Sequence, residues 1–229
     1  MTESKYDKNI EEESIIGEFL DKYFYPEIEE KYNNNIKNIT RNYDVAKQNK
    51  GVDVILECRD GYRINIDEKT ATDYLNKNIP TFALEISFLK DNIKKDGWLF
   101  GEKYCDTDTY LFCWGWKVDE DEELTVENIQ RIEAYSVRKN ELQQLLEDDY
   151  GLNKYNYKEK SKLAVQEIDR SPKGQKVFLN GESGPRWHIS RNLNEEPVNL
   201  VTPKHVLKQV AKAIFQINKN NTCIEIQRH

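Results

Sequence analysis

The sequence of 229 residues has no apolar run near the ~18 residues that a membrane-spanning helix needs, so an integral membrane protein is excluded. Its first fifteen residues are acidic and polar, which argues against a secretory signal peptide. Its 4 cysteines occur without any C-x-x-C spacing, and with only 3 histidines beside them we expect no structural zinc site. These absences leave a cytoplasmic globular protein, and 13 Tyr, 8 Phe and 4 Trp provide ample surface for a core.

The net charge of −7 conceals an asymmetry along the chain. Residues 1–150 contain 20 basic and 34 acidic side chains, whereas residues 151–229 contain 14 basic and 7 acidic ones. A basic C-terminal third is typical of a surface that faces a polyanion such as nucleic acid. A solvated basic face without any partner has the same composition, so both interpretations stay open.

Hydrophobic periodicity predicts a helix and then a hairpin in the first third of the chain. Apolar residues between 15 and 24 recur at three- and four-residue spacing, which predicts a helix from about Ile10 to Tyr32 that Pro26 ends or kinks. The stretch at 33–44 is polar and rich in turn formers. Residues 52–58 and 62–68 then alternate between apolar and polar around Asp60-Gly61, which predicts a β-hairpin with a tight turn.

The rest of the chain predicts an α/β (α+β) fold. We expect a short helix or turn at 70–78, strands at 81–89, 109–118 and 128–137, and a helix at 138–152 with Gly151 as its C-terminal stop. A polar loop or insertion at 153–185 precedes a strand at 198–202 and a helix at 203–217. This order predicts a single domain over 1–229, with a central mixed β-sheet flanked by helices.

The hairpin carries the residues that are best suited to chemistry. Asp67 and Lys69 share one face of a strand because side chains alternate with a period of two, and Asp53 can face them from the neighbouring strand. Two carboxylates beside an ammonium suit a hard cation such as Mg²⁺, whose shell is completed by water and substrate phosphate. If a bulge shifts the register, Glu68 replaces Asp67 as the liganding acid.

The run from Gly51-Val52-Asp53 through the hairpin to Asp67-Glu68-Lys69 resembles the core of the PD-(D/E)XK nuclease superfamily. The resemblance covers residues 10–118 and implies a restriction-endonuclease-like fold. It also implies that Asp53, Asp67 and Lys69 are catalytic, and that both aspartates and Glu68, through its main-chain carbonyl, bind Mg²⁺ or, in its place, Mn²⁺.

The family commonly adds a glutamate from the preceding helix, for which Glu18 matches best and Glu13 second. Two features depart from the family's pattern. Val52 stands where a proline usually precedes the first aspartate, and the polar residue that often follows the lysine is matched only approximately, by Thr70, Thr72 or Tyr74.

Four basic side chains surround Trp187 in the sequence: Lys173, Lys176, Arg186 and Arg191. We predict that this cluster binds nucleic acid through phosphates and a stacked, unpaired base. In the alternative, Trp187 is a core residue between solvated arginines. Lys204, Lys208 and Lys212 recur every four residues, either along a phosphate backbone or on the outer face of a helix.

Together these residues predict a Mg²⁺-dependent endonuclease that hydrolyses DNA phosphodiester bonds. A catalytically inactive binding module on the same scaffold is the main alternative, since the acidic N-terminal two thirds suits a protein partner. An unrelated α/β enzyme is less well supported, because no G-x-G-x-x-G, Walker A or G-x-S-x-G string occurs. A homodimer is needed only for coordinated cuts in both strands of a duplex.

Overall fold

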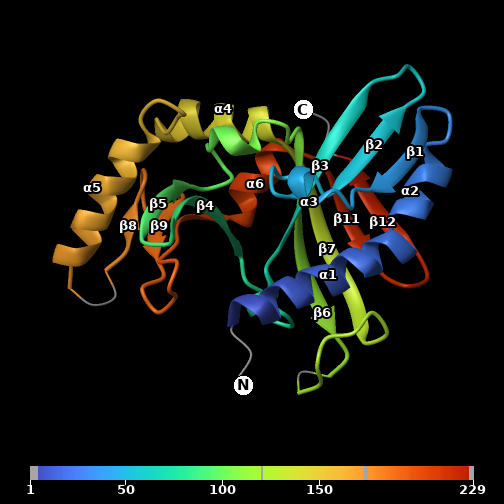
Figure 1. Ribbon diagram of the computed structural model, residues 1–229, viewed down its shortest axis with the longest axis horizontal. Coiled ribbons are helices and arrows are strands. Elements are labelled where there is room, and N and C mark those ends of the chain that lie inside the picture. Colours follow the sequence, from blue (N-terminus) through green and yellow to red (C-terminus); the bar gives the residue numbers. More distant parts are fainter. Residues whose placement is uncertain (1–4, 120, 173–174, 227–229) are drawn as a thin grey trace. The chain divides into compact units, whose positions relative to one another are not determined.

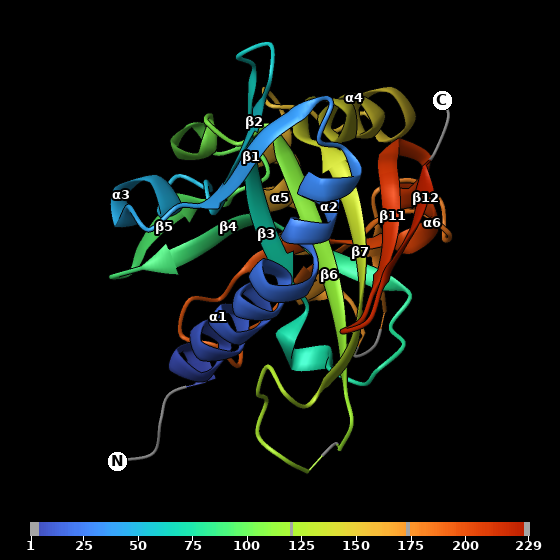
Figure 2. The same ribbon diagram turned by 90° about the vertical axis from the view of Figure 1, so that its right-hand side faces the viewer.

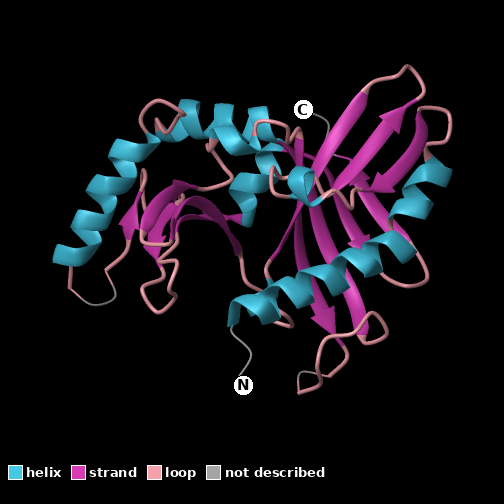
Figure 3. Ribbon diagram, in the orientation of Figure 1, coloured by secondary structure: helices cyan, strands magenta, loops and turns pink. Residues whose placement is uncertain are grey.

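The computed structural model describes residues 5–119, 121–172 and 175–226. The chain forms two compact units, each of which mixes helices and strands (Figures 1 and 3). Unit 1 comprises Met1–Ile79, Thr107–Val137 and Ala211–His229, and unit 2 comprises Pro80–Asp106 and Arg138–Val210. Both units are therefore assembled from segments that are discontinuous in the sequence.

Unit 1 is built on a seven-stranded sheet with the strand order β1-β2-β3-β6-β7-β11-β12. Its strands are β1 (Ile36–Arg41), β2 (Val54–Cys58), β3 (Arg63–Thr70), β6 (Thr109–Lys117), β7 (Ile129–Arg138), β11 (Ala211–Ile217) and β12 (Thr222–Ile226). β3 and β6 are parallel, whereas β2 is antiparallel to both β1 and β3, and β11 to both β7 and β12. The predicted mixed sheet is confirmed.

Helices α1 (Lys5–Tyr23) and α2 (Tyr25–Lys31) cover one face of this sheet (Figure 2). Ile16, Phe19 and Leu20 of α1 are at most 1% exposed and pack in one cluster with Leu111 and Cys113 of β6. The predicted break at Pro26 is confirmed, because α1 ends at Tyr23 and the proline lies in the first turn of α2. The short helix α3 (Val45–Gln48) and the 3₁₀ turn η1 (Thr72–Tyr74) complete the unit.

Unit 2 contains a five-stranded antiparallel sheet with the order β5-β4-β10-β9-β8. Its strands are β4 (Thr81–Lys90), β5 (Ile93–Asp96), β8 (Val177–Phe178), β9 (Arg186–Ile189) and β10 (Val198–Pro203). Its helices are α4 (Lys139–Tyr150), α5 (Tyr157–Arg170), α6 (Lys204–Val210) and the 3₁₀ turn η2 (Glu102–Tyr104). α5 packs beside β8 and β9, and α6 packs beside α4 and β10.

Several local predictions are confirmed. β2 and β3 form the expected hairpin, in which Gly61 takes the left-handed conformation with φ +90°. α4 ends at Gly151, whose φ of 61° matches a glycine C-cap. Trp187 is 4% exposed, so its alternative interpretation as a core residue is the right one. Among the described residues, none of the helices is long and apolar enough to cross a membrane.

Other local predictions are wrong, for physical reasons that the structure supplies. The turn-rich stretch at 33–44 contains strand β1, whose pairing register shifts between Ile36 and Asn38, so a period-two pattern is absent. The strand at 81–89 exists as β4, but it belongs to the five-stranded sheet rather than to the central one.

The segment at 153–185 is not a loop throughout, because it contains α5 and β8. The buried residues of α5 are Tyr157, Ser161 and Ala164, and two of these are too small or polar to give an apolar signal. The predicted helix at 203–217 ends at Val210, and residues 211–217 form β11 between β7 and β12. Lys212 therefore lies on a strand, which ends the proposed lysine stripe at Lys208.

The packing of α1 gives a direct test of the core. We expect Ile16→Ala to lower the free energy of unfolding by about 2–5 kcal/mol, because Ile16 is 1% exposed. Ile10→Ala in the same helix, where the side chain is 49% exposed, is the matched control and should cost far less. Urea denaturation followed by tryptophan fluorescence measures both, and equal losses would contradict the packing described.

Candidate active site

Asp53 and Asp67 lie opposite each other at the end of the β2–β3 hairpin. Val54 pairs with Ile66, so these two aspartates are the next residues along the two strands. The N–H of Asp53 donates to the carbonyl of Ile66 at 2.9 Å, and the Asp53 Oδ2 accepts a bond from the N–H of Glu68 at 2.9 Å. The hydrogen bonds of the ladder thus hold the Asp53 carboxylate beside β3.

Asp67 and Lys69 share one face of β3, as the period of two predicts. The Lys69 Nζ lies 2.5 Å from the Asp67 Oδ1, and the Asp67 side chain is 1% exposed. Burial by itself would lower the pKa of Lys69, but the carboxylates of Asp67 and Asp53 raise the pKa above its ordinary value. Lys69 therefore remains an ammonium ion at neutral pH.

The second oxygen of Asp67 has unmet hydrogen-bonding capacity. The Asp67 Oδ2 is buried and has no hydrogen-bond partner. Gly51 approaches it so closely that a Cβ at position 51 would lie 2.7 Å from this oxygen and 2.5 Å from the Thr107 Oγ1. The Thr107 hydroxyl donates to the Gly51 carbonyl at 2.8 Å and fixes this approach. A buried acceptor without a hydrogen-bond partner favours the binding of a cation or of a hydrogen-bond donor.

The site also perturbs the Asp53 carboxyl group. Burial raises the pKa of Asp53 to about 7; the Lys69 ammonium opposes this rise, and the Asp67 carboxylate adds to it. Two neighbouring carboxylates with one ammonium carry an excess of negative charge. A bound cation would relieve that repulsion.

The helix that precedes the hairpin contributes Glu13 rather than Glu18. Loss of solvent raises the pKa of Glu13, while Lys69 lowers it and Asp67 raises it further, so Glu13 lies within electrostatic reach of the pair. Glu18 instead lines a groove with Lys22 and Glu123. Five helical positions separate the two glutamates, which turns one about 140° from the other. The structure thus brings the second-ranked helix acid within electrostatic reach of Asp67 and Lys69, whereas Glu18 lines the groove on α1.

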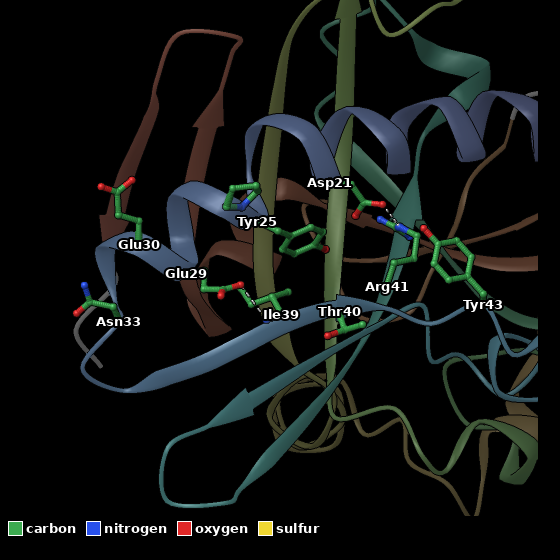
Figure 4. A pocket seen from close by; sticks show the side chains of 10 residues that line it. Asp21, Tyr25, Glu29, Glu30, Asn33, Ile39, Thr40, Arg41 and Tyr43 are labelled. Atoms are coloured by element: carbon green, nitrogen blue, oxygen red, sulfur yellow. Dashed lines mark hydrogen bonds and ion pairs between the residues drawn. The ribbon is translucent and has the colours of Figure 1, made fainter.

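The Glu68 carboxylate points to the opposite face of β3, and the register of β2 and β3 has no shift, so Asp67 and not Glu68 shares a face with Lys69. It accepts bonds from the Tyr25 hydroxyl at 2.5 Å and from Arg41 Nη1 and Nη2 at 2.9 and 3.0 Å. Arg41 also donates to Asp21 at 2.5 Å, a contact that Figure 4 shows. Only the main-chain carbonyl of Glu68 stays a candidate ligand.

The predicted nucleic-acid-binding residues belong to unit 2, and one of them, Arg191, is engaged in ion pairs. Arg191 forms ion pairs with Asp169 at 2.5 Å and with Glu196 at 3.3 Å. Arg186 is half-buried on β9, and Lys176 is exposed. Lys173 lies outside the described residues. The aromatic partner of this cluster, Trp187, is buried and does not present its ring for stacking.

The acids of unit 1 that could hold a Mg²⁺ ion are few. Among residues 5–119, 121–172 and 175–226, no group of three or more His, Cys, Asp or Glu side chains is arranged to hold a metal ion. Protein-bound Mg²⁺ commonly takes one or two carboxylates and keeps several waters. Asp53 and Asp67 meet that smaller requirement, and the unpartnered Asp67 Oδ2 is a fitting donor.

No family model, curated protein or solved structure matches the chain. The interpretation of this site therefore depends on its own residues. Sequence reasoning missed Arg41, Tyr25 and Thr107, which position the site from other elements. The one signal in the sequence was Gly51, placed directly before Val52-Asp53.

The Glu68–Arg41 contact predicts that substitution of Glu68 lowers the stability of the fold. Glu68→Ala should lower the free energy of unfolding by about 3 kcal/mol, because it leaves the mostly buried Arg41 guanidinium short of a partner. Glu57→Ala on β2, which removes two ion pairs with the exposed Lys37 and Arg63, is the control and should hardly move the urea midpoint. Similar midpoints for the two variants would contradict this assignment.

Alanine substitutions at the two left-handed glycines of the hairpin region distinguish backbone strain from crowding at Asp67. Gly51 and Gly61 have φ of +76° and +90°, so alanine is strained at both positions. Only at Gly51 does the added methyl group meet Asp67 and Thr107, because nothing lies within 4 Å of a Cβ at Gly61. Gly51→Ala should therefore reduce the melting temperature clearly more than Gly61→Ala. Equal effects would show that Gly51 does not press against Asp67.

Proposed function

We propose that this protein is a Mg²⁺-dependent nuclease that hydrolyses phosphodiester bonds of DNA. The observation that supports it best is the convergence of Asp53, Asp67 and Lys69 at the end of one hairpin, with an unpartnered oxygen on Asp67. Acids next to a fixed cation in a partly buried site are the groups that phosphoryl transfer uses.

Each residue has a role that follows from its surroundings. Asp53 and Asp67 would hold Mg²⁺ or Mn²⁺, and the Glu68 carbonyl is the third candidate donor. When bound, the ion supplies Lewis-acid stabilisation of charge on the phosphoryl group. Lys69 stays protonated beside Asp67, so it orients the attacking water or the phosphate through its ammonium and does not act as the base. The Glu13 carboxylate, with its raised pKa, is suited to accept the proton of that water.

The resemblance to the PD-(D/E)XK superfamily supports the same proposal. A helix with an acid, a strand that follows Asp53, a tight hairpin and a strand that ends in Asp67-x-Lys69 occur in unit 1 in the order that the family pattern requires. In this proposal Glu13, whose pKa Lys69 and Asp67 affect, has the role for which Glu18 was the first choice. Val52 in the proline position remains a departure from the pattern.

Cleavage and metal binding test the proposal together. We expect Mg²⁺ or Mn²⁺ to raise the melting temperature of the wild type, since an ion at a hundred times its Kd adds about 2.7 kcal/mol of stability. The same ions should support cleavage of labelled DNA. Asp53→Asn should lose both effects, and Lys69→Ala should lose cleavage while its circular dichroism stays native.

The two helix acids provide a matched pair for the same assay. Glu13→Gln should slow cleavage by roughly 100-fold if Glu13 accepts a proton, whereas Glu18→Gln should cleave as the wild type does. Wild-type protein that neither cleaves DNA nor responds to Mg²⁺ or Mn²⁺ would refute the proposal. That result would favour an inactive binding module in which Asp67 and Lys69 form a structural ion pair.

A further inference from the structure

The segment from Asn42 to Gly51, which joins β1 to β2 through α3, is pinned to the strand end that carries Asp53. The N–H of Asn42 donates to the Asp53 carbonyl at 2.7 Å, and the Asn42 Nδ2 donates to the Val52 carbonyl at 2.6 Å. Gln48 closes the segment by donating to the Asn42 carbonyl at 2.9 Å. Its backbone is therefore held in one conformation beside the candidate active site.

This fixed segment exposes apolar side chains that the core does not use. Tyr43 is 79% exposed and Val45 is 66% exposed, and neither belongs to the core cluster of unit 1. Tyr43 directly follows Asn42, so its Cα lies within roughly 9 Å of the Asp53 Cα. The Tyr43 side chain is exposed on a backbone that lies close to the candidate site, so it is available to a substrate.

Tyr43 also forms one end of an open groove of about 590 Å³ beside β1, a volume typical of small-ligand sites. Figure 4 shows the groove running from Glu30 and Asn33 to Arg41 and Tyr43. The Asp21 and Glu29 carboxylates that line it repel phosphate, and each already accepts one hydrogen bond, from Arg41 and from the N–H of Ile39. A nucleobase, which offers N–H donors and a π-face, fits such a lining better than the nucleic-acid backbone does.

Two cationic residues follow Tyr43 closely in the sequence. Between residues 42 and 52 the sequence contains Lys47 and Lys50 and one acid, Asp44. The Asp44 carboxylate is engaged as the N-cap of α3, where it accepts from the N–H of Ala46 at 2.9 Å. Lys47 is exposed and suited to pair with a phosphate.

We propose that Tyr43 stacks on an unpaired base next to the scissile phosphate while Lys47 pairs with the backbone, so that the preferred substrate is single-stranded DNA. This inference rests on the proposed nuclease function, because the scissile phosphate is taken to bind at Asp53. Base–aromatic stacking favours single strands because a duplex does not offer the face of its bases. The segment takes over the role that the sequence suggested for the Trp187 cluster.

Fluorescence anisotropy with labelled oligothymidine and a duplex of equal length, both in EDTA, tests the inference. Tyr43→Ala should weaken single-strand binding by about tenfold or more and leave duplex binding unchanged. Tyr43→Phe, which keeps the ring, should bind as the wild type does. Lys47→Ala should reduce the slope of log affinity against log salt by about 0.7. Tyr62→Ala and Tyr155→Ala, which change exposed tyrosines at 61% and 84%, are the matched controls and should bind normally.

The outcomes separate this inference from the proposed function. The inference is overturned if Tyr43→Ala binds the single strand as tightly as the wild type, or if it loses affinity equally for single strand and duplex. It is also overturned if the wild type binds RNA of the same sequence more tightly than DNA, or binds neither DNA. If the wild type cleaves and Tyr43→Ala behaves identically, only the inference fails. If Tyr43→Ala shows the expected binding loss but the wild type never cleaves with Mg²⁺ or Mn²⁺, the nuclease proposal fails, and of the inference only single-strand binding by Tyr43 and Lys47 remains.

Discussion

Three consecutive ionisable residues in the sheet, Asp67, Glu68 and Lys69, are the constraint on which unit 1 depends. Charges removed from water are costly unless each is paired. The period-two alternation of β3 sends Asp67 and Lys69 to one face, where they pair with each other, and Glu68 to the other, where Arg41 and Tyr25 hold it. The two faces of β3 thus have different roles. The Asp67–Lys69 ion pair belongs to the candidate site, and the Glu68–Arg41 ion pair links α1, α2 and β1 to the strand that carries the site.

The part of the site within the hairpin could be predicted because it depends on local geometry. The Asp-Gly turn fixes the register of β2 and β3, and the register fixes which side chains share a face. The choice between Glu13 and Glu18 depends on the rotation of α1 over the sheet, which no local pattern specifies. Arg41 could not be found because it belongs to a strand with an irregular register, 27 residues away from Glu68.

The fold shows the same limit at a larger scale. Elements with strong local signals, such as α4 with its glycine cap, match the sequence closely. Residues 211–217 look helical by periodicity, yet pairing with β7 and β12 makes them a strand, since tertiary context overrides a weak propensity. α5 was missed for the opposite reason, because small and polar residues on its buried side hide a helix that packing maintains.

The order in which the chain leaves the ribosome gives the discontinuous sheet of unit 1 a particular consequence. Strands β1 to β7 of this sheet are complete by residue 138, but β11 and β12 follow only after residue 210. During translation, β7 would therefore remain an open edge with unpaired backbone groups while the second segment of unit 2, Arg138–Val210, is synthesised. The nascent chain passes through an interval in which its central sheet is vulnerable to association with other strands, and the pairing of β11 with β7 ends that interval.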